Sequence, residues 1–191
     1  MKKVLCLLLA AVLCLGLTGC SSGKVDVNGE WYTLLIEPYE GTVARQPGKL
    51  TDLPEELQED WSGYEATFRK LSGSLTVIEV SDGDRAALMF ARKGSSGDWA
   101  LYWLNKPAEF TSFKDGEGIT YWVGDEDDAE PFTYTLSENT LTLNAEDLST
   151  AGEVEVWDKN VFVWTKDDDW HPSQWAFIRV DTVLGDDLRL K

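Results

Sequence analysis

The sequence predicts an all-β fold, built either as an antiparallel barrel or as a β-sandwich. Beyond residue 60, short apolar runs recur roughly every eight to twelve residues, a spacing typical of these two architectures. Turn-forming residues separate the runs, for example at Asp82-Gly83-Asp84 and Ser137-Glu138-Asn139. A helical fold is disfavoured because only one short segment after residue 20 has helical character.

The chain begins with a segment that has the features of a secretory signal. Lys2 and Lys3 precede an apolar run over residues 4–17. A run of about fourteen residues is shorter than the ~20 that a helix needs to span a bilayer, and its length and flanks match a signal peptide. We therefore expect residues 1–19 to be removed, with a buried core helix or an uncleaved anchor as the alternatives.

The end of this run, Leu17-Thr18-Gly19-Cys20, resembles the lipobox of bacterial lipoproteins. The resemblance implies that the Cys20 thiol receives a diacylglycerol, that cleavage occurs before Cys20, and that the new amino terminus is acylated. Two or three chains on one residue make a stable anchor. We expect residues 20–28 to form a lipidated tether, with the domain on the extracytoplasmic side of the membrane.

Charge and cysteine content narrow the possible partners. Without Lys2 and Lys3, the 17 basic residues fall to 15 against 34 acidic ones, a formal charge of −19. This charge disfavours nucleic acid and electrostatic adhesion to anionic lipid, so the lipid on Cys20 is the expected membrane contact. Cys6 and Cys14 lie in the leader, so the remaining chain has no cysteine pair for a disulfide.

A single domain is expected over residues 29–181, followed by a tail over 182–191. Its first strand is expected at 29–37, and a loop at 38–48. A short helix is then expected at 53–58, with Thr51 or Asp52 as its cap and Pro54 near its first position.

Ten further apolar runs are expected to be strands. Two of them, 99–104 and 161–165, are apolar on both faces, whereas a half-exposed strand alternates apolar and polar residues. Their second face must be covered by the segment 38–63, by a partner or by a ligand. The expected strands are 65–70, 74–80, 86–92, 99–104, 118–123, 132–136, 140–143, 153–157, 161–165 and 175–180.

The first expected strand carries Gly29-Glu30-Trp31, which resembles the G-x-W motif that opens lipocalins and related calycin barrels. The resemblance implies that Trp31 plugs the closed end of a barrel and that Arg179 packs across it. The hairpin at 134–143 is also similar to one in small bacterial lipocalin-like lipoproteins. We therefore expect a lipocalin-like barrel with a short helix in its first long loop; a β-sandwich is the alternative.

The chain departs from the lipocalin pattern in three respects. It has no match for the T-D-Y element, no long helix before the last strand, and about eleven apolar runs instead of eight. Additions to the barrel, or broken strands, would account for the extra runs.

Several aromatic side chains are candidates for ligand binding. They would line a cavity for an apolar ligand or stack on sugar rings at the surface, and core packing is the alternative. The candidates are Trp99, Tyr102, Trp103, Tyr121, Trp122 and Trp164, with Trp175 as a further member.

Other polar clusters give no pattern for a metal, a cofactor or catalysis. The acidic runs at 125–128 and 167–169 lack the glycine that an EF-hand loop requires at its sixth position, so we interpret them as solvated loops. His171, the sole histidine, precedes a proline, and no G-x-S-x-G motif is present. No metal ligand or catalytic residue is predicted.

These observations predict a membrane-anchored, non-enzymatic protein of the cell envelope that binds a small apolar ligand or an envelope partner. The alternative is a carbohydrate-binding surface module that uses exposed Trp and Tyr side chains. An envelope hydrolase is a third possibility, disfavoured because no nucleophile and base are recognisable.

Overall fold

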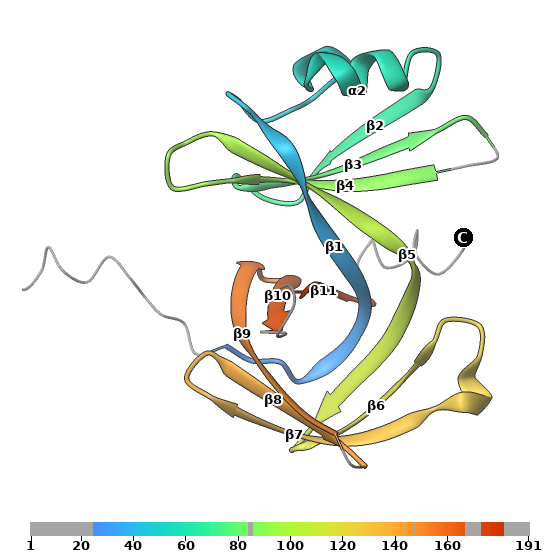
Figure 1. Cartoon of the computed structure of the whole chain (residues 1–191), viewed down its shortest axis with the longest axis vertical. Helices are drawn as coiled ribbons and strands as arrows, with labels where there is room; N and C mark the ends of the chain where they lie inside the picture. Colours follow the sequence, from blue (N-terminus) through green and yellow to red (C-terminus); the bar gives the residue numbers. More distant parts are fainter. Residues whose placement is uncertain (1–24, 84–85, 147, 167–172, 182–191) are drawn as a thin grey trace, which may run out of the picture.

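The computed structural model describes residues 25–83, 86–146, 148–166 and 173–181 (Figure 1). The predicted all-β fold class is confirmed: eight strands close an antiparallel barrel, to which further strands are added, consistent with a lipocalin-like barrel. The strands are β1 (Gly29–Val43), β2 (Glu65–Lys70), β3 (Leu75–Ser81), β4 (Ala86–Lys93), β5 (Trp99–Lys114), β6 (Glu117–Trp122), β7 (Glu130–Ser137), β8 (Thr140–Ala145), β9 (Leu148–Asp158), β10 (Val161–Lys166) and β11 (Ser173–Arg179).

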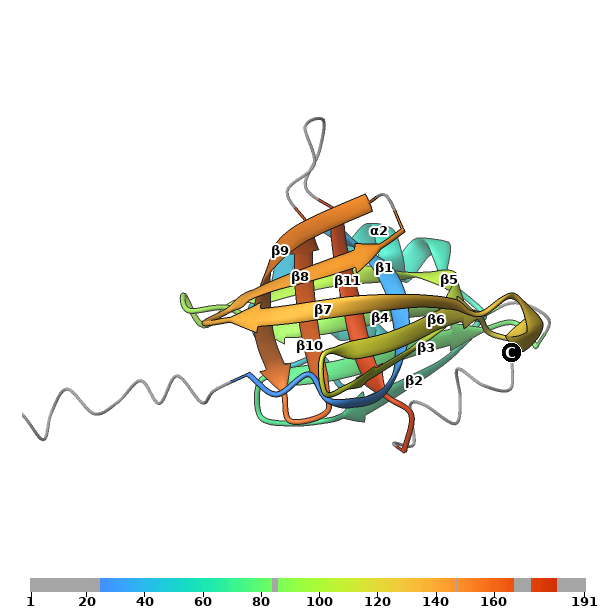
Figure 2. The ribbon, with the colours of Figure 1, turned by 90° about the horizontal axis from the view of Figure 1, so that it is seen from below.

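The barrel is a simple meander closed by its first strand. Strands β5 to β11 pair in chain order, β11 pairs with β1, and β1 pairs with β5. Viewed from below, β7 and β8 cross in front of β10 and β11 on opposite walls (Figure 2). Strands β2, β3 and β4 continue the sheet beyond β5, so they are an insertion between the first two barrel strands and account for the eleven runs.

Strands β1 and β5 belong both to the barrel and to the inserted sheet, and they are longer than predicted (Figure 1). The predicted loop at 38–48 is wrong in its first part, because β1 continues to Val43 and pairs with the first half of β5. Among the described strands, this part of β1 pairs only with β5, so Pro38 lies at an edge where a missing N–H is tolerated. A register shift between Pro38 and Thr42 accommodates the irregular stretch.

The inserted strands form a sheet that covers the outside of the barrel. Outward-facing side chains of β1, β10 and β11 pack against β3, β4 and the first half of β5. Tyr32 and Leu34 come from the barrel side of this layer, and Val77 and Phe90 from the inserted sheet. The chain itself therefore covers the second face of β10, where Val161 and Val163 lie.

The opposite face of the inserted sheet is covered by the segment between β1 and β2. This segment contains a 3-10 turn, η1 (Leu50–Asp52), and the helix α2 (Glu55–Asp60). Leu53, Leu57 and Trp61 bury Trp99 and Leu101 of β5. A second 3-10 turn, η2 (Glu126–Asp128), lies between β6 and β7. Among the described residues, no helix has both the length and the apolar composition that crossing a bilayer requires.

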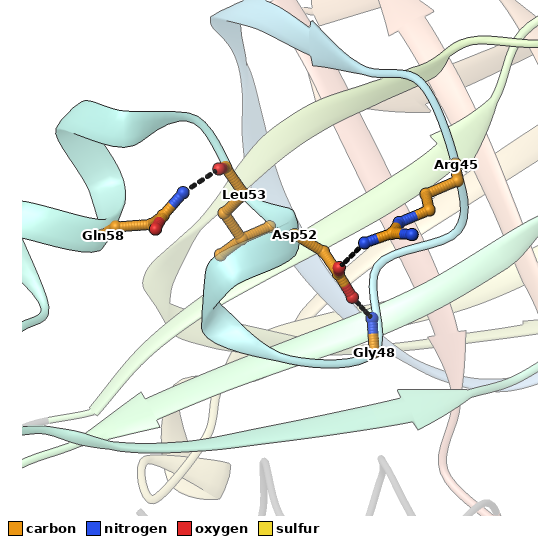
Figure 3. A network of polar contacts seen from close by, with 5 residues as sticks. All are labelled: Arg45, Gly48, Asp52, Leu53 and Gln58. Carbon is orange, nitrogen blue, oxygen red and sulfur yellow. Dashed lines mark hydrogen bonds and ion pairs between the residues drawn. The ribbon is translucent and has the colours of Figure 1, made fainter.

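The helix start differs from its prediction. Helix α2 begins at Glu55 after Pro54, and no side chain caps it, so the proposed caps Thr51 and Asp52 are wrong. Asp52 instead accepts hydrogen bonds from the Gly48 amide at 3.0 Å and from the Arg45 guanidinium at 2.5 Å (Figure 3). These two donors, the amide first, hold the pKa of the Asp52 carboxyl below its usual value of 3.8.

Asp52→Ala should lower the free energy of unfolding at pH 7 by roughly 1–2 kcal/mol, because it removes both hydrogen bonds of this turn. The pKa of Asp52 is lower in the folded than in the unfolded protein. The carboxylate therefore contributes its full stabilisation at pH values above 3.8, and this stabilisation is lost as the pH falls through the pKa of the folded state. Urea unfolding of both proteins between pH 7 and pH 2.5 measures this. The exposed Glu59→Ala on α2 is the control, and a difference independent of pH would contradict the assignment.

Candidate functional site

One end of the barrel is closed by Trp31. Its buried ring packs edge-on against Phe162 at 4.7 Å, and its indole N–H donates to the Val27 carbonyl at 2.8 Å. The Arg179 guanidinium lies over the same ring, 4.3 Å from its centroid. The structure thus places side by side the two residues that the lipocalin resemblance assigned to the barrel plug.

Gly29 makes room for this arrangement. Its φ of +130° favours glycine, and a Cβ at this position would lie 2.5 Å from the guanidinium of Arg179. The guanidinium also donates to the Asn28 carbonyl at 3.2 Å. The φ of this position therefore requires the glycine of the G-x-W motif, and the missing Cβ leaves room for the Arg179 guanidinium.

The segment before β1 crosses the closed end. Val25 and Val27, within the predicted tether, are buried against Trp31 and its neighbours. Asn28 accepts a hydrogen bond from the Tyr134 hydroxyl at 2.7 Å. The packed domain therefore starts at least four residues before Gly29.

The other half of the barrel contains a cavity of about 400 Å³. It extends from Phe132 and Phe177 to Lys166 at the end of β10 and Ser173 at the start of β11. One wall is mainly apolar, the other mainly polar. The lining residues are Thr33, Glu109, Thr111, Thr120, Phe132, Leu143, Ala145, Thr150, Trp164, Lys166, Ser173, Trp175 and Phe177.

The apolar wall is built from β7, β8, β10 and β11. Trp164 and Trp175 lie directly opposite each other in the β10–β11 ladder. Gly152 on β9 leaves room for the Trp164 indole, because a Cβ there would lie 2.4 Å from the indole nitrogen. The indole N–H donates to the Leu141 carbonyl at 3.2 Å, so the ring is held in place beside the cavity.

The polar wall is a cross-strand patch on β1, β5 and β6. Thr33 lies opposite Glu109, and Thr111 lies opposite Thr120. The three hydroxyls form a chain: Thr33 donates to Thr111 at 2.9 Å, and Thr111 and Thr120 are 3.2 Å apart. Thr120 donates to the Phe110 carbonyl at 3.1 Å and lies 3.5 Å from the Glu109 carboxylate.

Glu109 is the acidic group of this wall. The pKa of its carboxyl is raised above the usual value, mainly because the group is partly buried. The hydrogen bond from Thr120 lowers this pKa, and the negative charge of Glu130 raises it further. Glu130 lies opposite Thr120 in the β6–β7 ladder. The cavity therefore holds a carboxylate whose charge the surrounding protein does not fully compensate.

The predicted aromatic candidates are not brought together. Trp164 lines the cavity, as does Trp175. Trp99 is buried beneath the α2 segment, and Trp103 packs edge-on against Trp61 at 5.6 Å in the same layer.

The remaining three candidates lie elsewhere. Tyr102 packs on Trp157 at 4.9 Å between the inserted sheet and the barrel, and Tyr121 stacks on Phe110 at 4.7 Å. Trp122, 47% exposed, lies opposite Glu109 and on the same face of the sheet. Five of the six candidates therefore do not line the cavity; for most of them, core packing is the role that the structure shows.

Other predicted features lie outside the cavity or outside the described residues. The acidic run 125–128 is exposed around η2, and among the described residues no group of three or more metal-ligating side chains is positioned to hold an ion. Cys20, His171, the acidic run 167–169 and the tail 182–191 lie outside the described residues.

A broader hollow of about 610 Å³ lies on the outer face of β5 to β8. The charged side chains of Lys114, Glu117 and Glu146 line it, and of its described lining residues only Phe132 is aromatic. It lacks the facing polar and aromatic walls of the barrel cavity. The barrel cavity is therefore the better candidate site.

Most residues of the cavity were not predicted from the sequence. Thr33, Glu109, Thr111 and Thr120 are polar residues that face the inside of the barrel, so they break the apolar alternation by which strands are recognised. Thr111 and Thr120 are β-branched, which favours strands, and this was the available signal.

Comparisons of the chain with protein-family models, with curated proteins and with solved structures give no match.

Proposed function

We propose that this protein is a lipid-anchored, lipocalin-like binding protein of the cell envelope that takes a small, partly apolar ligand into the open half of its barrel. The observation that carries the proposal is the cavity of about 400 Å³ with Trp164, Trp175 and Leu143 on its apolar wall. Binding sites for small molecules are typically concave, mainly apolar, and furnished with a few placed polar groups.

The anchor would set the orientation of this site. Cys20 precedes Val25 by about five residues, which reach at most ~18 Å when extended. Since Val25 is packed at the closed end, that end would face the bilayer, and the cavity would open away from it. A ligand would then enter from the aqueous side.

The distribution of exposed aromatic rings favours the cavity over a carbohydrate platform. Stacking on a glycan surface needs several exposed rings in one plane. Among the described residues, the exposed large aromatic side chains are Tyr64, between α2 and β2, and Trp122, at the end of β6. Two rings on separate elements do not form such a platform.

Filling the cavity should weaken ligand binding. In Ala145→Phe the new ring would occupy space beside Leu143, so the affinity for 4-phenylbutan-1-ol should fall at least about tenfold. The measurement is isothermal titration of the full chain in a maltoside detergent, with a titration of detergent alone subtracted.

Thr142→Phe is the matched control, because Thr142 lies on the same strand with its side chain on the opposite face. Wild type and this control should bind one equivalent of the alcohol. Absence of saturable binding by the wild-type protein would overturn the proposed function, and retention on a panel of polysaccharides in affinity electrophoresis would favour the carbohydrate alternative.

A further inference from the structure

The polar wall of the cavity has an excess of hydrogen-bond acceptors. Thr33 donates to Thr111, and Thr120 donates to the Phe110 carbonyl, so the Thr111 proton is directed to Thr120. All three hydroxyl protons are thus used within the wall. What the wall presents to the cavity is oxygen lone pairs and the carboxylate of Glu109.

Glu109 has little internal compensation. Within the described part of the chain, its hydrogen-bond donor is the Thr120 hydroxyl at 3.5 Å, whose single proton is shared with the nearer Phe110 carbonyl, whereas a carboxylate can accept about four hydrogen bonds. Among the described residues, no cationic side chain forms an ion pair with it, and the nearby charge of Glu130 is also negative. Removing a charge from water without a partner is unfavourable, so a cation in the cavity would be stabilised here.

Lys166 is the cation that lines the cavity. It lies at the end of β10, opposite Ser173 and Gly152, and it already takes part in another interaction. It is therefore less suited than Glu109 to select the charge of a ligand. The strongly acidic composition of the chain, with a formal charge of −17, also attracts cations and repels anions.

We propose that the cavity selects amphipathic amines: a protonated amine donates to Glu109 at the polar wall, while its apolar body lies against Trp164 and Trp175. This inference rests on the proposed function and adds the chemical class of the ligand. The cavity volume limits the body to a ring with a short chain.

The test compares three probes that share one apolar body and differ in the head group: 4-phenylbutylamine, 4-phenylbutan-1-ol and 4-phenylbutanoate. Titration of the full chain at pH 7, under the conditions given above, should show that the amine binds about ten- to a hundredfold more tightly than the alcohol, as expected for a charge-assisted hydrogen bond. The carboxylate should bind more weakly than the alcohol.

Glu109→Gln should remove the preference for the amine, so that the amine and the alcohol bind this variant with affinities within about twofold of each other. Glu117→Gln is the matched control, since Glu117 is exposed on the outer face of β6. The control should retain the preference. The melting temperature of Glu109→Gln should not fall, because the substitution removes a half-buried charge that no cation pairs with, so a loss of the amine preference would not reflect unfolding.

The outcomes separate the two proposals. If the alcohol binds but the amine has no advantage, or if Glu109→Gln keeps the advantage, the amine proposal is overturned and the proposed function stands. A preference for 4-phenylbutanoate would assign the selectivity to Lys166 and also overturn it. If none of the three probes binds the wild-type protein, both proposals fail.

Discussion

Trp31→Ala should lower the free energy of unfolding by about 3–5 kcal/mol, the range typical of a large aromatic side chain deleted from a core. Trp31 is 2% exposed and fills the closed end of the barrel. The substitution leaves a cavity beside Phe162, frees the Val27 carbonyl from its hydrogen bond, and removes the ring on which Arg179 packs. Urea unfolding followed by circular dichroism measures the change.

The control for this prediction is Trp122→Ala. Trp122 is 47% exposed, so its loss should change stability by no more than about 0.5 kcal/mol. Arg179→Met provides an intermediate case, because it keeps much of the apolar contact and removes a cation–π interaction worth about 1–2 kcal/mol. If Trp31→Ala unfolds at the same urea concentration as Trp122→Ala, the assignment of Trp31 as the plug is incorrect.

Cys20→Ala should abolish incorporation of labelled palmitate and leave the precursor unprocessed. The proposed anchor depends on one thiol, and a strongly acidic domain has no electrostatic attraction to anionic lipid that could replace it. Metabolic labelling in a bacterial host, followed by fractionation of membranes, measures both effects.

Cys14→Ala tests whether the effect is specific to position 20. Cys14 lies within the apolar run of the proposed signal peptide and should be dispensable for labelling. Continued palmitate labelling of Cys20→Ala would remove the basis for the lipid anchor. Loss of labelling in both variants would indicate a general failure of export.

The strand pattern was predictable wherever one face of a strand packs in a conventional core. Strand β2 has the predicted bounds, β4 is one residue longer than predicted, and β3 and β6 are each shifted by one residue. The second half of β5 was missed, because Glu109 and Thr111 face the inside of the barrel. A register shift in this strand, between its pairings at Asn105 and Glu109, further interrupts the alternation.

The residues of the candidate site were harder to predict, because a strand that carries aromatic side chains on both faces can lie either in a packed core or beside a cavity. Trp99 and Trp164 come from similar two-faced strands. The segment carrying Leu57 covers the first, whereas the second lies beside the barrel cavity. Local sequence does not distinguish these two environments, since the difference depends on which distant segment packs against each strand.

The sequence by itself determined the features that depend on neighbouring residues: the apolar run that precedes Cys20, the alternation that specifies β-strands, and the G-x-W motif at the start of β1. Tertiary structure decided which strands close the barrel and which lie outside it, and therefore where the cavity is. Thr33 and Glu109 meet there because β1 pairs with β5 across the whole insertion. The physical reason is that closure of a sheet joins residues far apart in the chain, while periodicity reports only the face on which each residue lies.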